Sequence, residues 1–313
     1  MFACTLFGID RQVYYRRIKR TSSRKLIASE VISLVLKIRN TMPRIGAKKL
    51  YYLLKIQLNQ LKIGRDKFID ILRANHLLLT PRRSYHITTN SHHRFRKHEN
   101  LILDLKICRP EQVWVSDITY VGKRENPCYL SLITDAYSKK IMGFYVADNM
   151  NTKSSLTALK NAIKQRRDKG KTLIHHSDRG LQYCSDQYQK LLYKNNIRCS
   201  MTQNSDPYEN AVAERINGIL KQEFNIDKFN QQLAVMKILI KDAIDLYNNE
   251  RPHYSNYMLT PNQMHKQNIV EMRTYKTKTP AKKSSYRCLI KYICLIICID
   301  YLGLVINLNF ANK

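Results

Sequence analysis

The chain has 313 residues and a hydrophobic fraction of 44%. This is enough for two or three domains that each bury a core, and it argues against wholesale disorder. Its 54 Lys+Arg against 24 Asp+Glu give a net charge of +30, which favours a polyanion as partner. Residues 1–100 carry +17, residues 101–230 only +6 and residues 231–313 +7. Basic flanks around a carboxylate-rich middle are typical of a nucleic-acid enzyme, and a basic protein with scattered acids is the alternative.

The cysteines argue against a secreted or zinc-ribbon protein. None of the eight forms a CxxC pair and no secretory signal precedes them, so neither a disulfide framework nor a zinc ribbon is expected. The apolar segment 288–308 is interrupted by Lys291 and Asp300, which leaves a run shorter than the roughly 18 residues of a membrane span. We expect a cytoplasmic protein without a membrane association.

In chain order, the first predicted region is helical and covers residues 1–80. Apolar residues recur at helical spacing within 27–39, 47–58 and 65–78, and Pro43, Gly46 and Gly64 separate the three segments. Short helices joined by tight turns indicate a helix-turn-helix unit that binds DNA. The candidate DNA-binding residues on its polar faces are Lys48, Lys49 and Arg65. A three-helix bundle with a solvated basic face is the alternative.

A basic linker is predicted over residues 81–110, where Arg and Lys are frequent and periodicity is weak. From residue 111 strand and helix patterns alternate, which predicts an α/β layer arrangement compatible with a ribonuclease-H-like sheet. The expected strands are 112–121, 128–137, 140–147, 172–178 and 197–201. The expected helices are 152–167, with Thr152 or Ser154 as its cap, 185–196 and 206–224.

Two aspartates occupy unusual places in the predicted strands. Asp117 shares a strand face with Val113 and Val115, and a carboxylate among valines is costly unless a cation or another partner compensates it. Asp178 follows the apolar run that begins at Leu173, where the strand leaves the sheet. Each aspartate has a structural alternative, an exposed strand end for Asp117 and a capped turn for Asp178.

The predicted helix 206–224 presents a polar stripe beside its apolar one. Pro207 suits its first turn. The stripe, at spacings of three and four residues, consists of Asn210, Glu214, Asn217 and Lys221. A single helix with such a flank is more often simply solvated. Lys221 lies two turns beyond Glu214, about 10 Å along the helix, where an ammonium group can hold a DNA phosphate.

Asp117, Asp178 and Glu214 taken together favour a metal site. Three carboxylates within about 4 Å repel one another by several kcal/mol even at an effective dielectric constant near 20, so cations must accompany them. Carboxylate oxygens select Mg²⁺ or Mn²⁺. Two such ions can activate a hydroxyl nucleophile and stabilise the leaving oxygen in a phosphoryl displacement.

The spacing of these acids, with 35 residues between Asp178 and Glu214, resembles the DD(35)E signature of retroviral-integrase-like transposases. The segments "VWVSDITYV", "LITDAYSKKIMGF", "HHSDRGLQYCS" and "PYENAVAERINGILKQE" resemble the transposase encoded by the second reading frame (OrfB) of bacterial insertion sequences. "LFGIDRQVYYRR", "RIGAKKLYYLL" and "YNNERPHYSNYMLTPNQ" also resemble that family. Together the motifs span residues 4–266.

The resemblance implies a ribonuclease-H-like core over residues 111–270, with a mixed five-stranded sheet and flanking helices. It implies that Asp117, Asp178 and Glu214 are catalytic and bind two Mg²⁺ or Mn²⁺ ions for DNA cleavage and strand transfer. DNA contacts are expected from Lys221, Arg215, Asn210 and Asn217, and Asp135 is expected to be structural. The implied partners are element-end and target DNA, further copies of the chain and the product of the upstream reading frame.

The chain departs from the family at Glu209, where Asp is usual, and in the tail 271–313, which matches nothing in the family. Two other functions stay open. One is a ribonuclease-H-like nuclease that cleaves without joining, and the other is an inactive DNA-binding remnant of a transposase.

Overall fold

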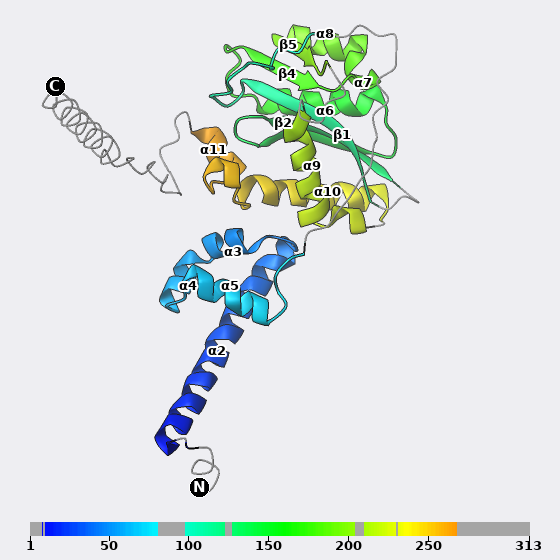
Figure 1. Ribbon diagram of the computed structural model, residues 1–313. Coiled ribbons are helices and arrows are strands. Elements are labelled where there is room, and N and C mark those ends of the chain that lie inside the picture. Colours follow the sequence, from blue (N-terminus) through cyan, green and yellow to red (C-terminus); the bar gives the residue numbers. More distant parts are fainter. Residues whose placement is uncertain are drawn as a thin grey trace, which may run out of the picture. The chain divides into compact units, whose positions relative to one another are not determined.

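The computed structural model describes residue 8 and residues 10–80, 98–122, 127–203, 210–229 and 231–267 (Figure 1). Within these ranges an all-helical region, residues 10–80, precedes an α/β region, residues 98–267. Both lie in one compact unit, and the tail 271–313 is a second unit outside the described residues. Within the described residues, no helix has both the length and the apolar character needed to cross a membrane.

The helical region contains four helices among its described residues, α2 (Arg11–Thr41), α3 (Ala47–Leu53), α4 (Lys55–Gln60) and α5 (Arg65–Ala74). The first begins at Arg11 rather than at residue 27, because the Asp10 side chain caps it by accepting a hydrogen bond of 2.6 Å from the Gln12 amide. The predicted helix 47–58 is divided into two at Leu54. Buried Val31, Val35, Phe68 and Leu72 join these helices in one core cluster.

The α/β region is built on one mixed sheet of five strands in the order β3-β2-β1-β4-β5. Central β1 pairs antiparallel with β2 and parallel with β4. The strands are β1 (Val113–Val121), β2 (Cys128–Asp135), β3 (Ile141–Ala147), β4 (Leu173–Ser177) and β5 (Ile197–Met201). All five predicted strands are therefore confirmed, with ends shifted by at most two residues. This arrangement confirms the predicted ribonuclease-H-like fold class.

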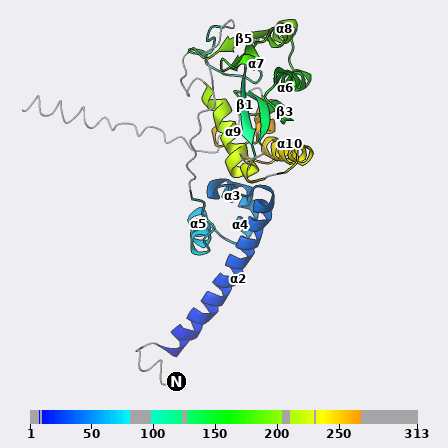
Figure 2. The same ribbon diagram turned by 90° about the vertical axis from the view of Figure 1, so that its right-hand side faces the viewer.

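Helices cover both faces of the sheet. On one face Trp114, Ile133 and Met142 pack against α6 (Thr152–Gln165), α7 (Leu181–Cys184) and α8 (Asp186–Lys194). On the other face, α9 (Ala211–Glu223) lies along β1, and α10 (Leu233–Asn249) packs against β3. Figure 2 shows α9 and α6 on opposite sides of the sheet. The sheet is thus buried from two sides, which explains its nearly continuous apolar strands.

Several boundaries differ from the sequence predictions. Helix α6 has Asn151 at its N-cap without a side-chain hydrogen bond, so the predicted capping by Thr152 or Ser154 is wrong. The predicted helix 206–224 is observed as α9 from Ala211, and the proposed role of Pro207 lies outside the described residues. Helices α7, α10 and α11 (Pro261–Lys266) were not predicted as helices.

Part of the predicted linker belongs to the folded core. Residues 81–97 lie outside the described residues, but Leu101, Ile102 and Leu105 pack against buried Val113 and Val115. The backbone amide of Leu101 donates a 2.9 Å hydrogen bond to the Ser200 hydroxyl beside β5. The α/β unit therefore begins before residue 111, because this segment closes one edge of its core.

Asp135 has the structural role expected for it. It is fully buried at the end of β2 and accepts hydrogen bonds from the amides of Glu111 and Ser138, both of 2.7 Å. The Ser138 hydroxyl also lies 2.9 Å from Nδ1 of His265 in α11. The opposite ring nitrogen of His265 lies 3.4 Å from the Glu111 carboxylate. This buried polar cluster attaches the C-terminal motif to the sheet.

Gly143 in β3 allows close approach between the sheet and α6. A Cβ atom at this position would lie 2.3 Å from the carbonyl oxygen of Ala158 and 2.6 Å from the amide nitrogen of Ala162. Both are backbone atoms of a packed helix and cannot rotate away. Glycine is therefore required here by packing rather than by backbone conformation.

We predict that Gly143→Ala lowers the free energy of unfolding by about 3 kcal/mol, since α6 must be displaced from the sheet. Urea denaturation followed by circular dichroism measures this change. The control is Gly218→Ala in α9, where no heavy atom lies within 4 Å of the added Cβ. This control should stabilise the protein by roughly 0.5–1 kcal/mol, as expected for a glycine inside a helix. Equal behaviour of the two variants would contradict the packing argument.

Candidate active site

The parallel pairing of β1 with β4 brings Asp117 and Asp178 to neighbouring positions. The register pairs Ser116 with Ser177, so the two aspartates are the next residues on adjacent strands. Adjacent strands lie about 4.8 Å apart, and paired residues point to the same face of the sheet. Both aspartates are partly exposed. The structure thus brings together two residues that are far apart in the sequence.

Asp117 is held by two hydrogen bonds from protein groups. Its Oδ1 atom accepts a 2.9 Å bond from the Ile118 amide, and its Oδ2 atom accepts a 2.6 Å bond from the Asn217 side chain. Asp178 accepts a 3.1 Å bond from the Gly180 amide in the turn before α7. Asp178 therefore does cap a turn, as the structural alternative expected. Its carboxylate nevertheless remains partly exposed beside Asp117.

Helix α9 supplies the third carboxylate. Asn210 at its N-cap donates a 3.2 Å hydrogen bond to the Ser116 carbonyl oxygen, and Asn217 donates to Asp117. Glu214 lies between these two attachments on the same helix flank, and its side chain is exposed. Two members of the polar stripe predicted from the sequence, Asn210 and Asn217, therefore contact β1.

The electrostatics of Asp117 reflect its two acidic neighbours as well as its burial. Burial, the charge of Asp178 and the charge of Glu214 together raise the pKa of Asp117 to about 7, against the hydrogen bonds from Ile118 and Asn217. Burial also raises the pKa of Glu214. A cation placed among these groups would offset this repulsion.

The carboxylates do not form a closed ligand set. Among the residues that the structure describes, no group of three or more His, Cys, Asp or Glu side chains stands ready to hold a metal ion. The Oδ1 atoms of Asn210 and Asn217 are buried and lack a hydrogen-bond partner. Carboxylate and amide oxygens are the donor types that Mg²⁺ accepts, so the residues present fit a hard divalent cation.

Lys221 lies on the same flank of α9, one helical turn beyond Asn217. Its ammonium nitrogen is 4.3 Å from the centroid of the Tyr120 ring of β1. Burial lowers its pKa, whereas the charges of Asp227 and Asp117 act in the opposite direction. The cation–π contact with the partly exposed Tyr120 therefore holds the ammonium group against β1.

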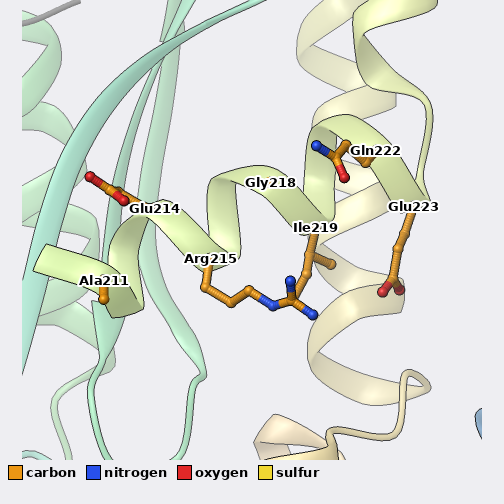
Figure 3. A pocket seen from close by; sticks show the side chains of 7 residues that line it. All are labelled: Ala211, Glu214, Arg215, Gly218, Ile219, Gln222 and Glu223. Atoms are coloured by element: carbon orange, nitrogen blue, oxygen red, sulfur yellow. The ribbon is translucent and has the colours of Figure 1, made fainter. Parts of the chain in front are cut away.

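Arg215 points to a different side of α9 from Glu214, although the two are adjacent in the sequence (Figure 3). Both line an open hollow of about 410 Å³ on the outer face of the helix, together with Gly218, Gln222 and Glu223. Arg215 is exposed. It is therefore accessible to a phosphate beside the candidate site.

The three DNA-binding candidates in the helical region differ in their surroundings. Lys48 and Arg65 are exposed, and Arg65 pairs with its neighbour Asp66 at 2.9 Å. Lys49 is placed differently from the prediction, because its Nζ atom lies 2.8 Å from the Glu223 carboxylate and its side chain is only 15% exposed. An ammonium group in this position links α3 to α9 rather than facing solvent.

Glu223 at the end of α9 is a linking residue that the sequence did not reveal. Its carboxylate also accepts hydrogen bonds of 2.7 and 2.8 Å from the guanidinium of Arg251, which is 2% exposed. Its backbone carbonyl accepts a 3.0 Å bond from the Arg44 amide. Glu223 therefore fixes the end of the helix that carries Glu214.

The pKa values of Glu223 and Lys49 show how burial and neighbouring charges act on this ion-pair cluster. The two cations lower the pKa of Glu223 to about 2 in spite of its burial. Burial and the charge of Arg251 lower the pKa of Lys49 to about 8 although Glu223 acts in the opposite direction. Glu223 is thus the member on which the cluster depends, since both cations would be uncompensated without it.

We predict that Glu223→Gln lowers the free energy of unfolding by about 3–5 kcal/mol, because Lys49 and Arg251 lose their counter-charge. The pKa of Glu223 is lower in the folded state, so its contribution is present above its ordinary pKa of 4.5 and is lost as the pH falls towards about 2. Chemical denaturation at a series of pH values should show a smaller acid decline in the variant than in the wild type. The exposed Glu250→Gln serves as control, and a loss of equal size there would contradict the prediction.

Comparison with protein families agrees with this architecture. Residues 108–207 match a family described as "Integrase core domain", and residues 195–261 match a second family of the same description. The first match covers β1 with Asp117 and β4 with Asp178 directly after it, and the second covers α9 with Glu214. The α/β unit is therefore an integrase core domain.

The relatives place this domain in a particular family. The chain is 30% identical over 255 residues to the "Insertion element IS600 uncharacterized 31 kDa protein" of Shigella sonnei, an alignment that covers 80% of this chain and 92% of the relative. It is 36% identical over 143 residues to the "Transposase for insertion sequence element IS629" of the same organism, covering 46% and 48%. The chain belongs to the family of insertion-sequence transposases of the OrfB type.

Solved integrase structures are also similar to this chain. The HTLV-2 integrase catalytic core domain in complex with magnesium, in its trimeric form, has a TM-score of 0.40 and 21% identity and covers 50% of this chain and 97% of its own. The simian T-cell lymphotropic virus intasome in complex with a PP2A regulatory subunit has a TM-score of 0.45 and 17% identity, covering 74% and 79%.

Proposed function

We propose that this chain is an active DNA transposase that cleaves DNA at the ends of its element and joins the freed ends to target DNA. The observation that carries the proposal is the meeting of β1, β4 and α9, where the strand register sets Asp117 beside Asp178 and Asn217, on the helix that carries Glu214, donates to Asp117. Neighbouring carboxylates at two partly exposed positions and one exposed position repel one another, which costs stability, and they suit phosphoryl transfer. Family membership supports the same reaction class.

The reaction consists of two phosphoryl transfers. In the first, water attacks a phosphodiester at the element end, the bond to the 3′ oxygen breaks, and a 3′-hydroxyl is released. In the second, this hydroxyl attacks a target phosphodiester, forms the new ester and expels a target 3′-hydroxyl. No net oxidation occurs, and each attack is followed by loss of one proton from the attacking oxygen.

Asp117, Asp178 and Glu214 would hold two Mg²⁺ or Mn²⁺ ions. When bound, these ions supply activation of the attacking oxygen and charge neutralisation at the leaving oxygen. The residues of the chain supply the geometry. Asn217 orients Asp117 through its 2.6 Å hydrogen bond, while Asn210 attaches the first turn of α9 to β1.

Phosphate groups would be held beside the carboxylates by Lys221 and Arg215. The ammonium of Lys221 lies over Tyr120, and Arg215 is exposed on the adjoining hollow. Lys48 and Arg65 are the remaining candidates in the helical region, whereas Lys49 is engaged by Glu223. The partners proposed are element-end and target DNA, further copies of the chain on that DNA and the upstream reading-frame product.

The direct test is a cleavage-and-joining assay with labelled element ends, target DNA and Mg²⁺ or Mn²⁺. We predict joined products from the wild type and a loss of at least about 10³-fold for Glu214→Gln, because the third anionic ligand is removed. Glu250→Gln should retain activity. Both variants should bind duplex DNA as the wild type does.

The other outcomes distinguish the alternatives. Cleavage without joining would identify a ribonuclease-H-like nuclease. Binding without either product, repeated with the upstream reading-frame product supplied, would identify an inactive remnant. Full activity of Glu214→Gln would refute the assigned triad.

A second prediction concerns Asn217 as a positioning residue. Asn217→Ala should lower the cleavage rate by about 10–100-fold, because Asp117 loses the donor that orients it. It should also raise the Mg²⁺ concentration needed for half-maximal cleavage, which a purely structural loss would leave unchanged. The control is Gln222→Ala on the exposed side of α9. An unchanged metal dependence of Asn217→Ala would contradict this role.

A further inference from the structure

The N-terminal half of α2 is a long helix without a packing partner among the described residues. Residues 11–26 are all exposed, while Val31 and Val35 in the second half are fully buried. Figures 1 and 2 show this half extending beyond α3–α5. A helix of this length is not stable in water through its own hydrogen bonds alone, so an exposed half is a candidate for a binding surface.

The charge of this half is of one sign. Between residues 11 and 25 there are seven basic side chains and no acidic one, and Glu30 is the only acid in the whole of α2. The basic residues are Arg11, Arg16, Arg17, Lys19, Arg20, Arg24 and Lys25. Such a surface is complementary to a polyanion and repels a second copy of itself.

One face of α2 is apolar in its second half and basic in its first half. Residues at spacings of three and four share a helix face. On the face that buries Val35 and Val31, the preceding positions are partly buried Ile27 and then exposed Arg24, Arg20 and Arg17. The stripe that forms the hydrophobic core in the second half is therefore continued by arginines in the first half.

An apolar helix partner does not fit this face. Guanidinium groups at the seam positions of a coiled coil would have to lose their hydration, which is costly without counter-charges. On the opposite face, exposed Ile18 and Leu26 are separated by Ser22 at the same spacing, so no continuous apolar seam is present there. A second copy of α2 is thus disfavoured on both faces.

Arginine in a row suits the phosphates of duplex DNA. Residues 11–25 span about 22 Å at the rise of an α-helix, and a helix is of a width that the major groove admits. Tyr14 and Tyr15 add exposed aromatic rings beside the basic groups, and the Arg11 guanidinium lies 5.6 Å from the Tyr15 ring centroid. Aromatic side chains between basic ones support nucleic-acid contacts.

We propose that residues 11–25 of α2 form a phosphate-binding helix for duplex DNA, with Arg16, Arg17, Arg20 and Arg24 as its main contacts. This proposal deepens the proposed function by assigning it a DNA-binding surface remote in sequence from the carboxylates. It does not depend on cleavage activity, because binding is measured in the absence of divalent metal.

The test compares two variants of the full chain that lose equal charge. The first carries Arg16→Gln, Arg17→Gln, Arg20→Gln and Arg24→Gln. The control carries Lys160→Gln, Lys164→Gln, Lys190→Gln and Lys194→Gln, four exposed residues of α6 and α8. Glutamine is nearly as good a helix former as arginine or lysine. The residues replaced in α2 are exposed, so circular dichroism and the unfolding temperature should remain unchanged.

Binding to a fluorescent duplex of about three helical turns is measured by anisotropy in EDTA at a series of salt concentrations. The α2 variant should bind at least about tenfold more weakly at 0.15 M salt, and its slope of log affinity against log salt should fall by about three to four. The control should change by less than about one slope unit. Restoring charge with four lysines at the arginine positions should restore binding.

Four results would overturn the proposal. One is an unchanged affinity of the α2 variant, and another is an equal loss in both variants. The third is a change in self-association by sedimentation with unchanged DNA affinity, which would identify a second copy as the occupant. A loss seen on only one of two unrelated duplex sequences would overturn the assignment to phosphates, since phosphates carry no sequence information.

Discussion

The contact between α9 and β1 is the constraint on which the rest of the candidate site depends. The 2.6 Å hydrogen bond from Asn217 to Asp117 joins residues 100 positions apart and determines where Glu214 lies relative to the sheet. It is made to a carboxylate whose pKa burial and two neighbouring charges raise to about 7. Helix α9, attached at this point, brings Glu214 towards Asp117, whose ionised form is already disfavoured. Proteins retain such a destabilising arrangement of acids where function requires it.

The two ends of α9 are attached by different kinds of interaction. At its beginning and middle, neutral amides of Asn210 and Asn217 bind β1. At its end, Glu223 receives both Lys49 of α3 and buried Arg251, which follows α10. The helical region is thereby coupled to the helix that carries Glu214. A lysine that the sequence assigned to DNA is used within the protein, where burial and Arg251 lower its pKa to about 8.

The basic charge of the chain is divided among separate tasks. Part of it, at Lys49 and Arg251, neutralises a buried carboxylate. Two further cations are carried by α9, where Lys221 lies over Tyr120 of β1 and Arg215 lines the open hollow. Seven exposed basic residues lie on the first half of α2, where arginines continue the apolar stripe of the packed half. Net charge indicates a polyanionic partner, but only the distribution of burial separates charges available to it from charges used internally.

The sequence by itself determined the kinds of elements and the identity of the candidate acids. Strand alternation placed Asp117 on a buried face, the end of an apolar run placed Asp178 at a strand end, and helical spacing grouped Glu214 with Asn217. These are local patterns, and local periodicity is sufficient to predict them. Only the tertiary structure decided the parallel register of β1 and β4, the bond from Asn217 to Asp117, the ion pairs of Glu223 and the exposure of the first half of α2. Each of these joins or separates residues distant in the chain, so it depends on packing that no short stretch of sequence specifies.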